Sequence, residues 1–265
     1  MSSDPATTSP DVVRPDVIVL MTDQERAAPP YETDDVARWR RDVLTGAQWF
    51  EDHGVSFRRH YTGSLACVPS RPTLFTGQFP DVHGVTQTNG LGKMEDDSRM
   101  RWLRSGEVPT LGHWFRAGGY DTKYVGKWHM THADLTIADG TSLSTHDATG
   151  TLDEAAVQQY LDADPLDEFG FSGWVGPDPH GAEPAKSGLV SDPVYADRAI
   201  GWLEDRYERR RRGDAEARRP FLLVVCFVNP HDIVFAPAWL GRMPGRGAQN
   251  PFAEPDAMTP PDVPA

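Results

Sequence analysis

The chain has 265 residues, 38% of them hydrophobic and 25% charged, which is the composition of a globular protein with a sizeable buried core. Its formal net charge of −13 argues against nucleic acid as a partner, because binding to a phosphate backbone requires a basic surface. Two cysteines cannot form a disulfide framework, and no apolar stretch reaches the length of a membrane span.

The N-terminal residues predict no element of secondary structure. Residues 1–14 contain Ser, Thr, Pro and Asp without periodicity, so we expect a disordered tail. They also lack the basic start and the apolar core of a secretory signal. The sequence therefore favours a cytoplasmic protein.

A strand and a helix are the first predicted elements. Residues 16–23, DVIVLMTD, are a short apolar run that ends in polar residues, which predicts a buried strand of a parallel sheet. Residues 42–54 have apolar side chains at helical spacing and end in glycine, which predicts a helix. The weak alternation of residues 55–62 indicates a further strand.

The central part of the chain predicts two helices, a strand and a long insertion. Residues 71–77, RPTLFTG, predict a short helix with its final glycine as the cap. Residues 108–130 predict a helix, a double glycine and a strand. The helix is expected to direct three residues inward: Leu111, Trp114 and Phe115. Residues 131–192 are polar and rich in Gly, Asp and Pro, so we expect a surface insertion with one helix at 152–162, of the kind that often carries specificity.

The last two predicted elements have the strongest patterns. Residues 191–213 predict a long helix that Asp192 caps and Gly213 ends. Residues 220–232, PFLLVVCFVNPHD, are a nearly continuous apolar run and predict a buried strand, with Cys226 as a small buried hydrophobe.

The alternation of strands and helices predicts an α/β fold with a mostly parallel sheet and helices on both faces. Such sheets place their chemistry just past the carboxyl ends of the strands. Each apolar run is followed by a pair of polar residues: Asp23 and Gln24, Lys127 and His129, and His231 and Asp232. We therefore expect these groups to share one site.

The residue types at this edge suit displacement at a sulfuryl or phosphoryl centre. Asp23 and Gln24 offer hard oxygen ligands, which Ca²⁺ and Mg²⁺ prefer, whereas no His/Cys cluster has zinc spacing. Arg71 and Lys127 can neutralise an anionic substrate, and a histidine such as His231 can move a proton near neutral pH. Positioning and charge neutralisation do most of the work in such reactions.

Four motifs support a family resemblance. Residues 67–77, CVPSRPTLFTG, resemble the C-x-P-x-R signature of the sulfatases, within the alkaline-phosphatase-like superfamily. Three further motifs occur in the family's order: VLMTDQ at 19–24, GKWH at 126–129 and NPHD at 229–232. The resemblance implies a three-layer sandwich with a mostly parallel central sheet. It also implies a catalytic domain over residues 15–240, followed at 241–265 by a tail, or a truncated continuation, with six prolines.

The resemblance gives Cys67 a particular chemistry. Taken alone, Cys67 is more simply a buried cysteine. In the family, a separate formylglycine-generating enzyme oxidises the motif cysteine to Cα-formylglycine, whose aldehyde hydrates to a diol. One hydroxyl attacks sulfur and the alcohol leaves, and the second hydroxyl then allows sulfate to be expelled. A serine has no second hydroxyl, so it could attack but could not release the sulfate.

The resemblance also implies metal ligands. Asp23, Gln24 and residue 67 would bind Ca²⁺, with Mn²⁺ or Mg²⁺ as alternatives, and the Asp-Gln pair is similar to the choline-sulfatase and phosphonate-monoester-hydrolase branch. Family members are longer and carry their remaining ligands in the C-terminal part. No Asp-Asn or Asp-His pair follows residues 220–229 here. The chain is therefore a fragment, or takes ligands from elsewhere, or has an incomplete site, since Ca²⁺ takes six or more oxygen ligands.

The remaining catalytic roles follow from the same motifs. Arg71 is implied to hold the formylglycine hydroxyl, Lys127 to contact the transferred group and His129 to contact the diol. His231 would lie near the leaving-group oxygen. Asn89 lies where the phosphonate-hydrolase branch places an asparagine on the substrate.

Three functions remain open from the sequence. The first is hydrolysis of a small-molecule sulfate monoester through formylglycine and a divalent cation. The second is hydrolysis of a phosphonate or phosphate ester by the same apparatus. The third is an inactive fragment that lacks the C-terminal metal ligands. We expect the maturation enzyme as a partner and neither nucleic acid nor a membrane, and the sequence leaves a homo-oligomer open.

Overall fold

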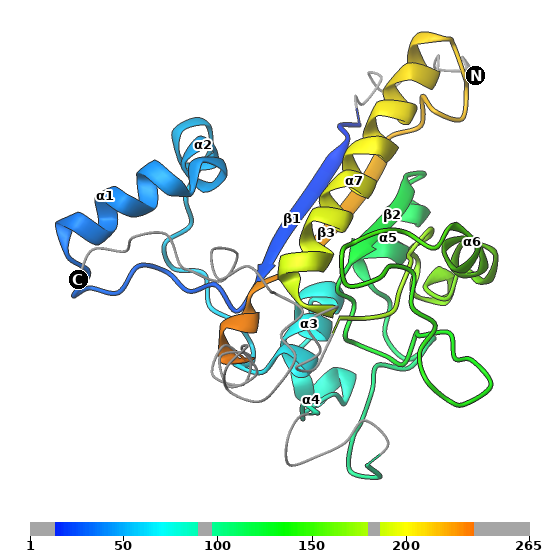
Figure 1. Ribbon diagram of the computed structural model, residues 1–265, viewed down its shortest axis with the longest axis horizontal. Helices are drawn as coiled ribbons and strands as arrows, with labels where there is room; N and C mark the ends of the chain where they lie inside the picture. The colour runs from blue at the N-terminus through cyan, green and yellow to red at the C-terminus, as the bar shows by residue number, and fades with distance from the viewer. Residues whose placement is uncertain (1–13, 90–96, 180–185, 236–265) are drawn as a thin grey trace, which may run out of the picture.

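The computed structural model describes residues 14–89, 97–179 and 186–235, so the expected tails at 1–14 and 241–265 lie outside the described residues, except for Arg14. In chain order, the strands and α-helices of Figure 1 are β1 (Val17–Asp23), α1 (Asp34–Val43), α2 (Thr45–His53), α3 (Cys67–Thr76), α4 (Pro80–His83), α5 (Leu111–Ala117), β2 (Asp121–Gly126), α6 (Glu154–Ala163), α7 (Gly188–Arg211) and β3 (Phe221–Pro230). Two 3₁₀ helices lie at Asp167–Phe169 and His231–Phe235.

Three parallel strands form the sheet, in the order β1-β3-β2. β3 is the central strand, and its Val224 pairs with Val19 of β1 and with Tyr124 of β2. The nearly continuous apolar sequence of β3 suits a strand that is covered on both faces. The strands predicted at 16–23, within 108–130 and at 220–232 are confirmed, as is their parallel arrangement.

Alternate residues of β3 face two different layers, as the pleat of a strand requires. Three of them pack in the cluster that contains Tyr195 and Ala199 of α7: Phe221, Leu223 and Val225. Three others belong to the larger cluster, to which α3 and α5 contribute: Leu222, Val224 and Cys226. Helices therefore cover both faces of the sheet (Figure 1), and the expected three-layer α/β arrangement is confirmed.

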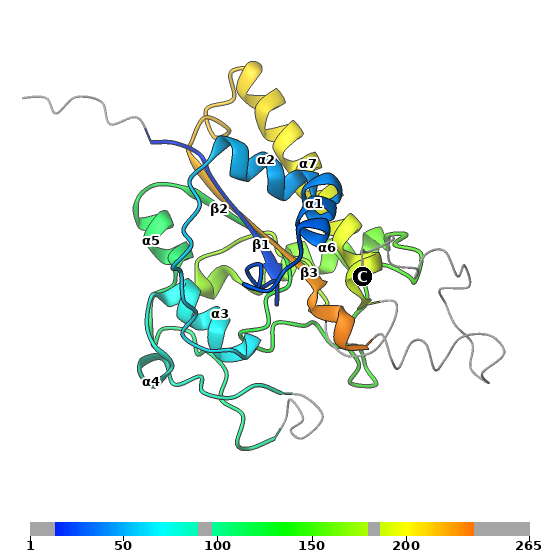
Figure 2. The ribbon, with the colours of Figure 1, turned by 90° about the vertical axis from the view of Figure 1, so that its left-hand side faces the viewer.

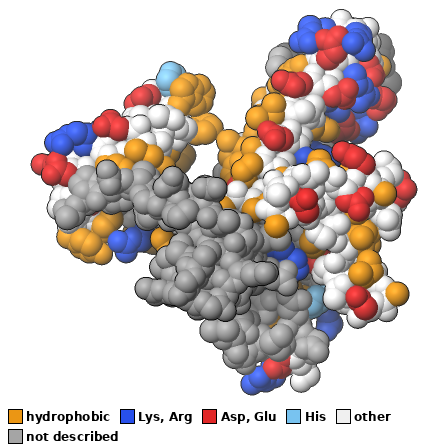
Figure 3. All heavy atoms as spheres, viewed as in Figure 1, with side chains coloured by type: hydrophobic (Ala, Val, Ile, Leu, Met, Phe, Trp, Pro, Cys, Tyr) orange, Lys and Arg blue, Asp and Glu red, His pale blue; other side chains and the backbone are white. Residues whose placement is uncertain are grey.

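β1 is an edge strand with one open face, which corrects the expectation that it is buried. Val17, Val19 and Met21 pack against the larger core cluster, whereas Ile18 and Leu20 are 46% and 50% exposed. Hydrophobic side chains are visible along this edge of the molecule in Figure 3. An apolar run predicts burial on both faces only when neighbouring elements supply two covering layers, and the described residues supply one.

α1 and α2 stand on the β1 side of the sheet, apart from the other helices, as Figures 1 and 2 show. Neither helix contains a buried residue. α2 lies within the helix predicted at 42–54, but α1 was not predicted, although Thr33 caps it by accepting from the N–H of Val36 at 3.4 Å. The strand predicted at 55–62 is wrong: the segment is irregular, and Val55 and Phe57 are each 80% exposed.

The segment 131–192 contributes to the core, which corrects the expectation of a surface insertion. Its predicted helix is present as α6. Four large residues of this segment are fully buried: Tyr160, Leu166, Phe171 and Trp174. The polar composition of the segment describes its turns, whereas a few large aromatic and aliphatic side chains decide where it packs.

Two smaller expectations also differ from the structure. Leu111 and Phe115 of α5 pack against the larger cluster as predicted, but Trp114 is 64% exposed. α7 begins earlier than predicted, with Ser187 as its N-cap, so Asp192 lies in the second turn and does not cap the helix. Among the described residues, no helix combines the length and the apolar character needed to cross a membrane.

Candidate active site

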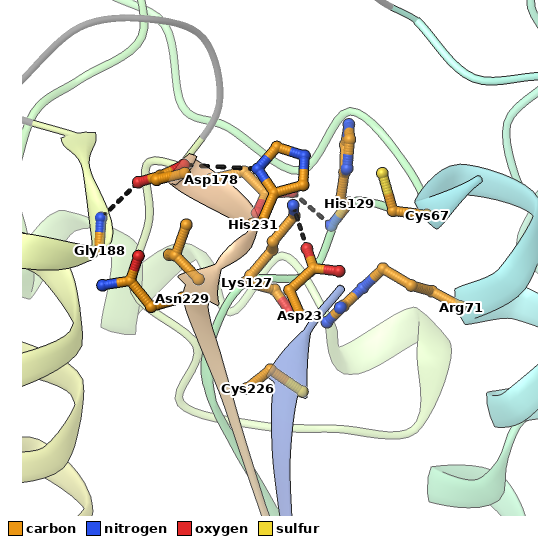
Figure 4. Close-up of polar contacts among 12 residues, drawn as sticks. Asp23, Cys67, Arg71, Lys127, His129, Asp178, Gly188, Cys226, Asn229 and His231 are labelled. Atoms are coloured by element: carbon orange, nitrogen blue, oxygen red, sulfur yellow. Dashed lines mark hydrogen bonds and ion pairs between the residues drawn. The ribbon is translucent and has the colours of Figure 1, made fainter. Parts of the chain in front are cut away.

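The carboxyl ends of the three strands meet the start of α3, and the predicted site residues gather there (Figure 4). Asp23 is the last residue of β1, and Lys127 directly follows β2. The Lys127 ammonium forms an ion pair with the Asp23 carboxylate, and their side chains are 1% and 10% exposed. Because both groups are nearly withdrawn from water, each compensates the charge of the other.

Asp23 is held in its ionised form by this arrangement. Burial by itself raises the pKa of the Asp23 carboxyl, but the positive charges of Lys127 and Arg71 outweigh it, and the net pKa is lowered. The carboxylate therefore offers a charged oxygen at the carboxyl edge of the sheet.

Cys67 occupies the first position of α3 and is half-buried. Its Sγ lies 4.0 Å from the Thr88 hydroxyl and shares a hydrogen bond with His231. Burial raises the pKa of the Cys67 thiol, but the His231 hydrogen bond and the charge of Lys127 lower it further than burial raises it. Residue 67 therefore lies among the charged side chains of the site and not in the apolar interior.

His231 follows β3 and is held by its sequence neighbour. Its Nδ1 lies 3.4 Å from Asp232 Oδ1, and Asp232 Oδ2 accepts from the N–H of Gly188 at 2.6 Å, in the first turn of α7. The hydrogen bonds with Asp232 and Cys67 raise the pKa of His231 to about 9, against the opposing effect of burial. Asp232 therefore orients the protonated ring of His231. The sequence suggested no such role for Asp232.

His129 lies two residues beyond Lys127, in a backbone conformation that is rare for residues with a side chain. Its φ is +50°, and its Nε2 lies 2.9 Å from Asn89 Oδ1. Gln24 also has a left-handed backbone, with φ of +65°, and its side chain is exposed. Such conformations persist where surrounding contacts enforce them, and both occur at this edge of the sheet.

Arg71 lies one turn into α3 and is 4% exposed. Its Nε donates to the Trp128 carbonyl at 2.7 Å, and its Nη2 donates to the Lys127 carbonyl and to the Tyr124 hydroxyl, the latter at 3.1 Å. Although burial lowers the pKa of Arg71, Tyr124 and other neighbouring groups raise it well above its usual range. These Arg71 nitrogens therefore bind two backbone carbonyls and the Tyr124 hydroxyl. A contact of Arg71 with residue 67 stays a prediction.

Asp178 is a site residue that the sequence reasoning missed. It is 3% exposed, and its carboxylate accepts from the backbone N–H groups of Trp128, at 2.9 Å, and of His129. Its own backbone N–H donates to Asp134 Oδ1 at 2.7 Å. The surrounding sequence, GPDPHG, resembles an ordinary turn, so only the tertiary structure reveals this contact.

The described residues supply part of a cation site. Among them, no group of three or more His, Cys, Asp and Glu side chains is arranged to hold a metal ion. Asp23 offers one charged oxygen and Gln24, the next residue, an amide oxygen, whereas Ca²⁺ takes six to eight oxygen ligands. A complete cation site would therefore need ligands beyond these residues.

Asp192 is a largely buried carboxylate beside the site, and its pKa is raised by its surroundings. Its two carboxylate oxygens accept from the N–H groups of Val228, at 2.6 Å, and Asn229, at 3.0 Å. Burial nevertheless raises the pKa of Asp192 to about 6, and the neighbouring Asp232 adds to the rise. The folded state thus binds a proton that the unfolded chain has already released, so this group disfavours folding above about pH 6 and not below about pH 4.

We expect Asp192→Asn to remove this pH dependence. Relative to the unsubstituted chain, the free energy of unfolding of the variant should rise by about 2 kcal/mol between pH 4 and pH 7, because the neutral amide has no proton to lose. Urea unfolding of both proteins at the two pH values measures the difference. An unchanged difference would show that Asp192 is already ionised at pH 4.

Comparison with known proteins identifies the family. The Sulfatase family profile matches residues 15–251. The chain is 29% identical over 186 residues to "Uncharacterized sulfatase YidJ" of Escherichia coli K12, covering 67% of this chain and 31% of that protein. It is 26% identical over 182 residues to the choline-sulfatase of Rhizobium meliloti, covering 66% and 31%. The chain thus spans about a third of the length of these curated relatives.

Solved structures include similar chains. A candidate sulfatase, yidJ, from Bacteroides fragilis aligns with 86% of this chain and 46% of its own, at a TM-score of 0.48 and 18% identity. The profile match carries the assignment, because it spans most of the chain and contains every strand whose end contributes to the site. The chain that brings Asp23, Cys67, Lys127 and His231 together therefore belongs to the sulfatase family.

Proposed function

We propose that this chain is the part of a sulfuric ester hydrolase that carries its nucleophile. The enzyme would cleave sulfate monoesters, with Cys67 converted to Cα-formylglycine. The observation that supports the proposal most directly is the position of residue 67. It begins α3, shares a hydrogen bond with His231 and lies beside the Lys127–Asp23 ion pair. A reactive oxygen at this position would meet both positive charge and a proton donor.

The start of α3 suits an anionic substrate. The first N–H groups of a helix have no partner within the helix, and the helix dipole favours negative charge at this end. Residue 67 stands at that end of a ten-residue helix. A sulfate ester approaching residue 67 would therefore be attracted before any chemistry takes place.

Lys127 and His231 have separate tasks in this proposal. Lys127 is a buried point charge, which neutralises the charge of the sulfuryl oxygens and keeps the ester in place for in-line attack. The hydrogen bond with Asp232, which does not depend on the conversion of residue 67, raises the pKa of His231 and so favours its protonated form. His231 can therefore give its proton to the alcohol oxygen as the ester bond breaks, which avoids release of a free alkoxide.

Residue 67 and a divalent cation would supply the remaining chemistry. A hydrated formylglycine provides one hydroxyl for attack on sulfur and a second for the expulsion of sulfate. A cation, when bound, lowers the pKa of a coordinated hydroxyl and screens the sulfuryl charge. Asp23 and Gln24 would hold it together with ligands from outside the described residues.

A substrate panel tests the proposal. The chain is produced together with a formylglycine-generating enzyme and supplied with Ca²⁺. Its hydrolysis of an aryl sulfate and of choline sulfate is then compared with that of an aryl phosphonate monoester and an aryl phosphodiester. We expect the sulfate esters to be preferred and hydrolysis to be lost when Ca²⁺ is removed with a chelator.

Two results would contradict this reading. A preference for the phosphonate or the phosphodiester would assign the chain to the phosphonate and phosphate ester hydrolases of the same superfamily. Absence of all hydrolysis, in protein whose residue 67 is shown by mass spectrometry to be converted, would assign it to fragments that lack part of the catalytic apparatus.

A further inference from the structure

Two consecutive peptide groups after β2 are held by hydrogen bonds on both sides. In the peptide between Lys127 and Trp128, the carbonyl accepts from Arg71, and also from the Tyr124 hydroxyl at 2.8 Å, while the N–H donates to Asp178. In the peptide between Trp128 and His129, the carbonyl accepts from Arg71 at 2.7 Å and the N–H donates to Asp178. Every hydrogen-bonding group of both peptides is thus used.

The two side chains that hold these peptides are oppositely charged and buried. Arg71 is 4% and Asp178 is 3% exposed, so neither charge is solvated by bulk water. Each is compensated through the aligned dipoles of the two peptide groups, whose carbonyls point to Arg71 and whose N–H groups point to Asp178. A flipped peptide would direct a carbonyl at the carboxylate and an N–H at the guanidinium, so the two charges permit one orientation only.

This orientation decides where three side chains go. Trp128, which is fully buried, packs edge-on against Tyr124 with ring centroids 5.2 Å apart. Its neighbours on either side, Lys127 and His129, are directed to the carboxyl edge of the sheet, where Lys127 reaches Asp23 (Figure 4). The carboxylate of Asp178 also holds the N–H of His129, whose left-handed backbone would otherwise be unfavourable.

We propose that Asp178 is a positioning residue which, with Arg71 on the opposite side, clamps the two peptide groups between Lys127 and His129 and so fixes the directions of both side chains in the site. Asp178 comes from the segment that the sequence suggested as a surface insertion, and its backbone is anchored in turn by Asp134. The clamp itself is a property of the folded chain, whereas its catalytic consequence rests on the proposed function.

Amide hydrogen exchange in Asp178→Asn tests the clamp without any need for turnover. A neutral amide keeps one acceptor oxygen but presents an NH₂ group to the second peptide N–H, so one hydrogen bond and the charge are lost. We expect the N–H groups of Trp128 and His129 to exchange at least about tenfold faster, which corresponds to about 1.4 kcal/mol. The Arg71 Nε–H should lose protection as well, although the substituted side chain lies on the opposite side of the two peptides.

Asp153→Asn is the matched control. Asp153 also accepts from two successive backbone N–H groups, those of Ala155 and Ala156, but it caps α6 away from the strand ends. Its substitution should leave exchange at Trp128 and His129 unchanged. Equal effects of the two substitutions, or unchanged exchange at Trp128 and His129 in Asp178→Asn, would overturn the proposal.

A double-mutant cycle adds a test of coupling between the two charges. Asp178→Asn, Arg71→Gln and the double variant are compared by urea unfolding. Because each single substitution leaves the opposite charge buried, the double variant should lose less stability than the sum of the two single losses. Additive losses would mean that the two residues act independently. If a single variant does not fold, unprotected Trp128 and His129 amides in the unsubstituted chain would equally refute the clamp.

The catalytic consequence is measured separately in the converted protein. Asp178→Asn should lower kcat for an aryl sulfate by about tenfold or more, while the extent of Cys67 conversion stays the same. An unchanged kcat beside altered amide exchange would show that the clamp does not position catalytic groups. Absence of turnover in the unsubstituted chain would contradict the proposed function and leave the exchange result to decide the clamp.

Discussion

Replacing Cys67 with serine or alanine is expected to abolish hydrolysis of sulfate esters, with a loss of about 10⁴-fold or more. The reason is chemical and not structural. Alanine has no nucleophile, and serine can attack once but lacks the second hydroxyl that expels the sulfate. Residue 67 is half-buried at the start of α3, and neither replacement is larger than cysteine, so the fold should be retained.

The measurement combines kinetics with the mass of the peptide that contains residue 67. In the unsubstituted protein, conversion exchanges one sulfur and two hydrogens for one oxygen, which changes the mass in a defined way. Cys226→Ala is the control, because Cys226 is the other cysteine of the chain and is fully buried in β3, where its Sγ accepts from the Tyr124 hydroxyl at 3.1 Å. Full activity of Cys67→Ala would refute the formylglycine mechanism. Repeated turnover by the serine variant would show that a second hydroxyl is not needed.

Replacing Lys127 with methionine is expected to destabilise the fold by about 3–5 kcal/mol and to remove activity. Methionine has nearly the same length, but it leaves the Asp23 carboxylate buried without its ion-pair partner. Added Ca²⁺ should restore part of the lost stability, because a cation bound by Asp23 takes the place of the missing ammonium. Urea unfolding with and without Ca²⁺ measures both effects.

Lys123→Met separates this prediction from the general cost of removing a largely buried lysine. Lys123 lies within β2, where its Nζ donates to the Gly173 carbonyl at 2.8 Å, and burial lowers the pKa of its ammonium to about 8. The stability that Lys123→Met loses should not be restored by added Ca²⁺. Equal responses of the two variants to Ca²⁺ would exclude Asp23 as a cation ligand. A Lys127→Met variant as stable as the unsubstituted chain would show that the ion pair contributes nothing to the fold.

The helix at α3 illustrates how much of the site could be predicted. Its end was predicted correctly from the glycine at position 77. In the structure, Gly77 caps the helix with a left-handed φ of +67°. The helix begins earlier than the predicted 71–77, at Cys67, without a side-chain cap. A cysteine at the first helical position carries no local helix signal of its own, so the sequence motif and not the propensity indicated its importance.

Burial was predicted less well than secondary structure. The apolar runs of β1 and β3 look alike, yet β3 is covered on both faces and β1 is half open, with Leu20 50% exposed. The polar segment 131–192 supplies Trp174 to the core. Periodicity reports what a strand or helix is able to bury, whereas the number of layers that cover it depends on elements distant in the chain.

By itself, the sequence determined the three strands of the sheet, their parallel arrangement and the residues that follow each strand, because long apolar runs that end in polar groups are strong local patterns. The weak alternation of residues 55–62 was not such a pattern, and it gave no strand. Only the tertiary structure decided that Lys127 pairs with Asp23, that Asp232 holds His231 and that Asp178 and Arg71 hold the peptides beside His129. These are contacts between side chains or backbone groups that come mostly from separate elements. Their geometry depends on how the layers pack, which no short stretch of sequence specifies.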